Sequence, residues 1–270
     1  MNILSSKWNL TLKVLPYVTI IVLLKLVAHQ MGWEFLTLNS LFGAIISANV
    51  FLVGFLISGV LVDYKEAEKI PGELACSIEV LTDECYIVHK NKQSQIPKDM
   101  MKYIHNLTGS ILNWLYKKEK TGIVLAKITG LNDYFLLLEP LTQANFIARL
   151  KNEQNNLRRM INRIHTIRET SFNPAGYAIA EIISAVLCVG LIFTKIDPYY
   201  ESVFFVAFVS FILMYMVLLI RDLDNPFAYY EKENLADEVS LKPLLDLENR
   251  IPHELEDLKP TKTGKSNKNS

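Results

Sequence analysis

The sequence has few of the residues from which catalytic and metal sites are built. Its 270 residues include three cysteines, Cys76, Cys85 and Cys188, and none lies in a CxxC pair or at metal-ligand spacing. The five histidines do not combine with each other or with a cysteine at such spacing, and no glycine-rich phosphate loop occurs. We therefore expect reduced, structural cysteines, no catalytic site, no resident metal or cofactor, and no enzymatic activity.

The chain also lacks an excess of either charge. Its 28 Lys and Arg residues balance 28 Asp and Glu residues, so no net field favours binding to nucleic acid. Half of the residues are nevertheless hydrophobic, although 21% are charged. This combination predicts an all-α membrane protein in which apolar spans are joined to a charged soluble part.

Four apolar segments are long enough to cross a bilayer, which takes about twenty residues per helix. Segment 35–62 has 28 residues without a formal charge, and segment 202–220 is nearly as clear. Segments 14–33 and 174–194 are interrupted by very few charged residues. We therefore expect four transmembrane helices, arranged as two hairpins.

Two charged residues lie inside these spans. Lys25 lies about 16 Å along the first helix at 1.5 Å per residue, whereas Glu181 lies in the first two turns of the third. Their different depths argue against a mutual ion pair, and we expect each to face water or the interface alone. A charge within a membrane span often marks a functional site, so a membrane enzyme built around Glu181 stays an alternative.

The positions of Lys and Arg predict the orientation in a plasma (inner) membrane. Segment 63–176 carries 16 Lys and Arg, while the connection after the first span has Glu34 and no basic residue. Both termini and segment 63–176 should therefore be cytoplasmic. The expected domains are a first hairpin (1–62), a helical cytoplasmic domain (63–176), a second hairpin (177–220), a cytoplasmic C-terminal junction and helix (221–259), and a disordered tail (260–270).

The expected cytoplasmic domain reads as amphipathic helices. The stretches KDMMKYIHNLTGSILNWLY (98–116) and NFIARLKNEQNNLRRMINRIHTIRE (145–169) place apolar residues at helical spacing. The stretch GIVLAKITGLNDYFLLLEP (122–140) contains enough branched residues for a strand, but a helix fits its neighbours better. We expect helices throughout this domain.

The second span carries a stripe at every fourth residue. Gly43, Ser47, Phe51, Phe55 and Gly59 share one slowly drifting face, which ordinary packing against a neighbouring helix would also explain. Gly54 and Ser58 form a separate small-residue patch that suits close helix contact. A segment rich in both charges follows this helix directly.

Two segments resemble the bestrophins and their prokaryotic relatives. These are EAEKIPGEL after the second span and DLDNPFAYYEKENLADEVSLKPLLDLENRI after the fourth. The resemblance implies a homopentameric, usually anion-selective channel whose second helix lines the pore. It also implies that Phe51 and Phe55, with Ser47 as a third member, form an apolar pore neck, which could stop ions by dewetting. The expected partners are other copies of the chain, the lipid bilayer and small inorganic ions such as chloride.

The same resemblance assigns a role to the end of the fourth span. It implies a junction that docks the last membrane helix onto the cytoplasmic domain. Pro226 would turn the chain there, and Phe227 would anchor it. The junction comprises Asp222, Asp224, Asn225, Pro226 and Phe227.

The sequence departs from the family pattern at two places. Asp63, Glu66 and Glu68 would form acidic rings beside the pore mouth of a pentamer, and such rings favour cations. A cation-selective channel of the same fold and a non-conducting membrane scaffold therefore stay alternatives. The acidic loop lacks the consecutive aspartates of a calcium clasp, although calcium regulation stays possible through oxygen ligands on Asp224, Glu231, Glu233, Asp237 and Glu238.

Overall fold

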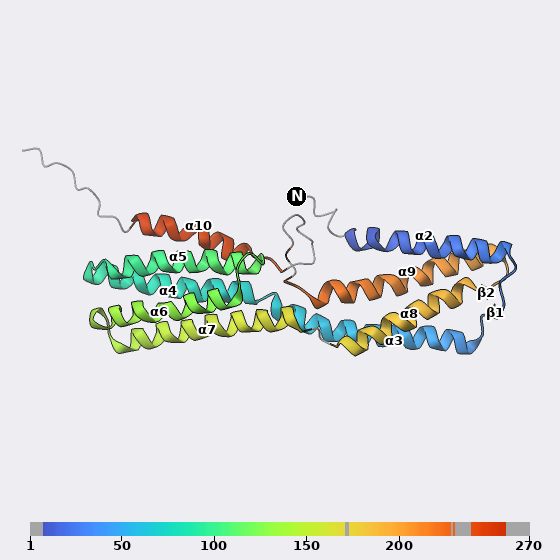
Figure 1. Cartoon of the computed structure of the whole chain (residues 1–270), viewed down its shortest axis with the longest axis horizontal. Helices are drawn as coiled ribbons and strands as arrows, with labels where there is room; N and C mark the ends of the chain where they lie inside the picture. Colours follow the sequence, from blue (N-terminus) through green and yellow to red (C-terminus); the bar gives the residue numbers. More distant parts are fainter. Residues whose placement is uncertain (1–7, 171–172, 228, 230–238, 258–270) are drawn as a thin grey trace, which may run out of the picture. The chain divides into compact units, whose positions relative to one another are not determined.

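The structure is a computed structural model that describes residues 8–170, 173–227, 229 and 239–257. The described chain is almost entirely helical and divides into two compact units, each with its own core. The elements that form the two units are labelled in Figure 1. The proposed calcium ligands Glu231, Glu233, Asp237 and Glu238 lie outside the described residues, as does the tail at 260–270.

The first unit consists of four long helices that pack against one another (Figure 1). They are α2 (Asn9–Gln30), α3 (Ser40–Ala67), α8 (Pro174–Ile192) and α9 (Tyr199–Asp224). Each contains most of one of the four apolar segments found in the sequence. In α9 the helix continues for one turn beyond the predicted span, so its last turn carries Arg221, Asp222 and Asp224.

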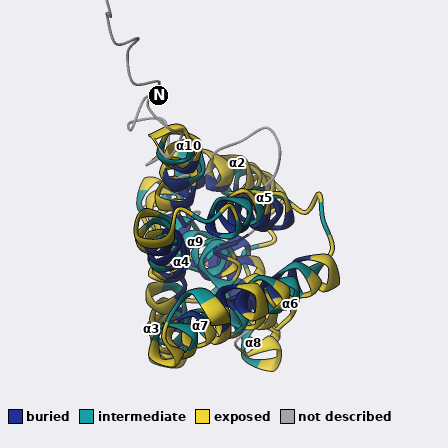
Figure 2. Ribbon diagram, turned by 90° about the vertical axis from the view of Figure 1, so that its left-hand side faces the viewer, coloured by how far each residue is buried: buried dark blue, intermediate teal, exposed yellow. Residues whose placement is uncertain are grey.

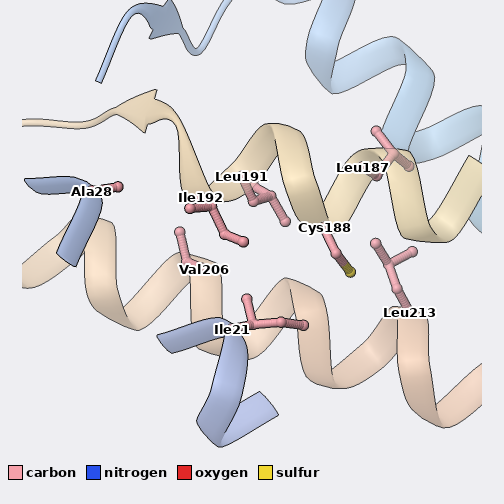
Figure 3. Packing of buried hydrophobic residues seen from close by; sticks show 8 residues of the cluster. All are labelled: Ile21, Ala28, Leu187, Cys188, Leu191, Ile192, Val206 and Leu213. Carbon is pink, nitrogen blue, oxygen red and sulfur yellow. The ribbon is translucent and has the colours of Figure 1, made fainter. Parts of the chain in front are cut away.

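Apolar side chains from three helices form a core in the first unit. Figure 3 shows Ile21 and Ala28 of α2 packing with residues of α8 and α9. The α8 members recur at helical spacing, and they include Cys188, which is a buried free thiol. A second cluster joins α3 to α8 and α9 through Val53, Leu56, Val60, Ala180 and Ile220.

The connections after α2 and α8 meet in a short parallel pair of strands. β1 (Leu36–Thr37) pairs with β2 (Thr194–Lys195), and Leu36 N donates to Phe193 O at 3.1 Å. The rings of Phe35 and Phe193 stack beside this pair, with centroids 5.2 Å apart. The two hairpins of the first unit are therefore joined through their connections as well as through their helices.

The second unit is a bundle of amphipathic helices. Its elements are α4 (Ile70–Lys92), α5 (Ile96–Leu115), α6 (Thr121–Leu138), the short 3-10 helix η1 (Glu139–Leu141), most of α7 (Ala144–Glu169) and α10 (Lys242–Asp257). The ambiguous stretch 122–140 is α6 and η1, so the helical prediction is confirmed there. Figure 2 shows buried residues along one side of the helices and exposed residues along the other.

The core of the second unit follows the predicted apolar stripes. In α5, Met101, Ile104, Leu107 and Ile111 are fully buried, as the spacing in the sequence indicates. Helix α10 buries Leu244, Leu247 and Ile251 at the same kind of spacing. Five stretches of the described residues contain helices long and apolar enough to cross a membrane, and one of them is α6 with η1. The number of four spans therefore stays a prediction.

Candidate functional site

Helix α3 has two different faces. One face packs within the first unit, where Val53, Leu56 and Val60 are almost fully buried. The other face leaves Phe51 with 78% and Phe55 with 66% of its surface exposed. The exposed phenylalanines therefore point away from the helices of their own chain. Packing within one chain, the ordinary explanation of the stripe, does not account for them.

Small residues surround these phenylalanines along the exposed face. Ser47 is exposed, and its hydroxyl donates to the carbonyl of Gly43 at 3.0 Å, so it needs no other partner within the apolar helix. Gly54 and Ser58 are exposed as well. Small residues let helices approach closely in a membrane. The exposed face of α3 is thus suited to close contact with another helix.

The acidic residues of the expected pore mouth lie at and just beyond the end of α3. Asp63 is half-buried, Glu66 is exposed, and both lie in the last turns of this helix. Glu68 is exposed and follows the helix, before α4 begins at Ile70. The exposed carboxylates are close in sequence to the exposed face of α3.

Lys25 is the most deeply buried charge in the first unit. Its side chain has no exposed surface, and Nζ donates to Glu34 Oε1 and to Thr194 O, each at 2.5 Å. Glu34 also contacts His29, whose Nδ1 lies 3.0 Å from Oε2. The His29 ring stacks on Tyr199, with centroids 3.8 Å apart. We call Lys25, His29, Glu34 and Thr194 the Lys25 cluster.

The Lys25 cluster corrects one expectation from the sequence. Lys25 does not pair with Glu181, as predicted, but it does not face water alone either. Burial of Glu34 opposes its charged form, yet the hydrogen bonds and positive charges of Lys25 and His29 outweigh that effect and lower the pKa of Glu34. A buried ammonium needs such partners because an unpaired charge is very costly in a medium of low polarity.

Glu181 likewise has a partner. Arg221 Nε donates to Glu181 Oε1 at 2.7 Å, which joins α8 to the last turn of α9. The expectation of an isolated Glu181 is therefore wrong. The pairing gives both residues a structural role in joining α8 to α9.

Both aspartates of the predicted junction contact other helices of the first unit. Tyr177 of α8 donates through its hydroxyl to Asp224 Oδ1 at 2.6 Å, and Lys13 Nζ of α2 lies 3.8 Å from Asp222 Oδ2. Asn225, which ends α9, is exposed.

Beyond Asn225 the chain is buried again. Pro226 is buried, and Phe227 has no exposed surface. Docking of this segment onto the expected cytoplasmic domain stays a prediction. Within the described residues, no three His, Cys, Asp or Glu side chains gather in a metal-binding arrangement.

No protein-family model matches the sequence, and no curated protein matches it. Crystal structures of a bacterial bestrophin homologue from Klebsiella pneumoniae do match. One, of a point mutant, has a TM-score of 0.75 at 16% identity and covers 92% of this chain and 100% of that chain. Another point mutant gives 0.72 at 17% identity, covering 92% and 100%. A structure phased with zinc gives 0.71 at 16% identity, covering 89% and 96%.

These matches confirm the predicted architecture. The chain is all-α and carries helices that are long and apolar enough to cross a membrane, as expected for an integral membrane protein. The similarity extends over nearly the whole chain although fewer than one residue in five is identical. The chain therefore has the bestrophin-like fold that its segments EAEKIPGEL and DLDNPFAYY predict.

Proposed function

We propose that the protein is a homopentameric ion channel in which five copies of α3 surround the pore. The observation that carries this proposal is the exposure of Phe51 and Phe55, 78% and 66%, on the side of α3 opposite its packed face. Around a five-fold axis, the two residues form two rings one helical turn apart. Ser47 contributes a third, less apolar ring. An apolar constriction of this kind blocks ions when it loses its water, so small changes of helix tilt would open or close it.

The proposed channel conducts chloride or other small anions, as the resemblance to bestrophins implies. A second candidate is cation conduction, because the carboxylates of Asp63, Glu66 and Glu68 lie at and just beyond the end of α3. Reversal potentials in asymmetric salt separate the two candidates. If the acidic residues select the ion, Asp63→Asn combined with Glu66→Gln shifts the reversal potential toward that of an anion channel.

The proposal includes the orientation that the positions of Lys and Arg predict. The termini and the second unit lie in the cytoplasm, and the membrane is the plasma (inner) membrane. Calcium regulation stays an alternative, with Asp224, whose Oδ1 accepts a hydrogen bond from Tyr177, as one candidate ligand. The channel should conduct without ATP or substrate.

The test replaces the proposed neck in protein reconstituted into planar bilayers. Phe51→Ala/Phe55→Ala removes the apolar barrier without opening a cavity inside the protomer, so conductance or open probability should rise while the pentamer persists. The matched control is Phe204→Ala/Phe208→Ala on α9. These two phenylalanines are also four residues apart, are 62% and 54% exposed, and stack with centroids 6.1 Å apart.

Three results would contradict the proposal. Equal currents from the Phe51→Ala/Phe55→Ala variant, the control and the unchanged protein would remove the neck assignment. A purified protein that is monomeric in mild detergent would favour the non-conducting scaffold. Loss of the pentamer in the Phe51→Ala/Phe55→Ala variant alone, with unchanged single-channel currents, would show that these rings serve assembly.

A further inference from the structure

A cavity of about 180 Å³ lies among three helices of the first unit. Its walls include Tyr17 of α2, Glu181 and Ser184 of α8, and Val217, Leu218 and Arg221 of α9. Helices α8 and α9 belong to one hairpin, so they run in opposite directions. The ion pair of Glu181 and Arg221 therefore lies at one end of the cavity, and Ser184 and Leu218 lie about one turn deeper.

The charged end of the cavity carries both signs. Arg221 pairs with Glu181 through Nε only, and its side chain is 57% exposed. Lys13, one turn before Tyr17 on α2, lies 3.8 Å from Asp222 and is 44% exposed. The guanidinium of Arg221 and the ammonium of Lys13 can thus each donate to a further acceptor without losing the partner they have.

Arg221 directly follows the apolar segment 202–220, so the charged end of the cavity lies where the expected fourth span meets the lipid headgroups. Arg221 is three residues before the end of α9, about 4.5 Å, and Glu181 is seven residues after the start of α8, about 10 Å. Ile182 and Val186 on the neighbouring surface of α8 are exposed and apolar. A ligand that fits this place has a charged head and an apolar tail.

We propose that the cavity binds one phospholipid with a primary-amine headgroup, of the phosphatidylethanolamine type. The lipid phosphate accepts hydrogen bonds from Arg221 and Lys13, because a guanidinium binds phosphate oxygens with directed N–H groups. The lipid ammonium donates to the carboxylate of Glu181. One acyl chain lies along Val217 and Leu218. The site is independent of ion conduction and needs only that the first unit lies in a membrane.

The balance of charge selects this class of lipid. An anionic headgroup such as phosphatidylglycerol offers acceptors to Arg221 and Lys13 but has no ammonium that donates to Glu181. Phosphatidylcholine supplies a cation, but its quaternary ammonium has no N–H to donate to a carboxylate. Phosphatidylethanolamine satisfies both signs at once.

Native mass spectrometry of the full-length protein tests the proposal with three lipids that share the same acyl chains. Phosphatidylethanolamine should bind about tenfold more tightly than phosphatidylcholine or phosphatidylglycerol, the size of one charge-assisted hydrogen bond. Arg221→Gln should remove most of this preference. Val217→Phe, which fills the cavity and keeps every charge, should weaken all three lipids. The control Arg250→Gln, in an exposed Arg–Glu pair of the second unit, should change nothing.

The results separate the proposal from its competitors. Equal binding of the three lipids, or a preference that survives both Arg221→Gln and Val217→Phe, overturns it. Competition by glycerophosphoethanolamine at concentrations equal to those of the lipid would identify a free headgroup as the ligand and overturn the lipid assignment. Loss of the oligomer in Val217→Phe with lipid binding intact would assign the surface to a neighbouring subunit. If Arg221→Gln does not fold, Val217→Phe still decides, because it retains the ion pair.

Discussion

Replacing Lys25 with methionine should destabilise the protein far more than removing an ordinary surface charge. Lys25 has no exposed surface, and its ammonium supplies hydrogen bonds to Glu34 and to Thr194 O. Methionine fills much of the same volume but cannot donate. The carboxylate of Glu34, which is only 10% exposed, then keeps His29 as its partner within the Lys25 cluster. Breaking a buried ion pair from one side costs about 3–5 kcal/mol.

The assay is reversible unfolding in mixed micelles, followed by far-UV circular dichroism. Lys25→Met, Glu34→Gln and the double variant form a thermodynamic cycle, in which the double variant should recover part of the lost stability because neither charge is left unpaired. Lys102→Met serves as the control. Lys102 pairs with Asp99 at 2.9 Å on the surface of the second unit, and such exposed pairs contribute about 0–1 kcal/mol.

Equal losses in the free energy of unfolding for Lys25→Met and Lys102→Met would refute this reasoning. If Lys25→Met and Lys102→Met cost the same free energy of unfolding, then water reaches Lys25 in the membrane protein and the cluster is not a buried ion pair. The same conclusion would follow if the free-energy losses of Lys25→Met and Glu34→Gln simply added in the double variant, because independent groups show no coupling.

Two further predictions concern single residues. The lowered pKa of Glu34 means that the folded state holds this carboxylate charged, so stability from Glu34 is present above its unfolded pKa of about 4.3 and is lost as the pH falls through the lower folded value. Melting curves below about pH 4 should show this loss, and Glu34→Gln should flatten it. Phe227→Ala should lower the free energy of unfolding by about 3–5 kcal/mol because Phe227 is fully buried. The control Phe205→Ala, at an exposed position, should cost little. Equal melting temperatures of the two variants would mean that Phe227 is exposed.

Helix positions could be predicted from hydrophobic periodicity, but helix ends could not. The sequence predicts the second span at 35–62, whereas α3 runs from Ser40 to Ala67. Its start is set by Asn39, whose side-chain oxygen accepts a hydrogen bond from Phe42 N at 2.9 Å. Its end continues through charged residues because charge ends a membrane span without ending a helix. Similarly, α2 ends before the predicted residue 33, and Gly32 follows with a φ of +69°.

The partners of the intramembrane charges could not be predicted from spacing along the chain. Periodicity states which face of a helix a residue occupies, but it does not state which connection folds back onto that face. Glu34 was recognised only as the acidic residue of a short connection, and Arg221 only as a charge after a long span. Glu34 lies beside Lys25, and Arg221 lies beside Glu181, because the chain turns back after a helix. The sequence shows each turn only as a change from apolar to polar residues.

The two pairings lie at the two ends of the first unit, and the proposed barrier lies between them. Lys25 bonds to the carbonyl of Thr194, just beyond the end of α8, whereas Glu181 lies near the start of the same helix, so the two charges mark opposite ends of the first unit. Each is held by a partner in its own chain. Between these levels, residues 40–62 of α3 carry no formal charge, and the large side chains on their exposed face include Phe51 and Phe55. In the proposed pore, an ion that passes along this face would meet no fixed charge of α3 until Asp63, and the free energy of removing its water would decide whether it passes.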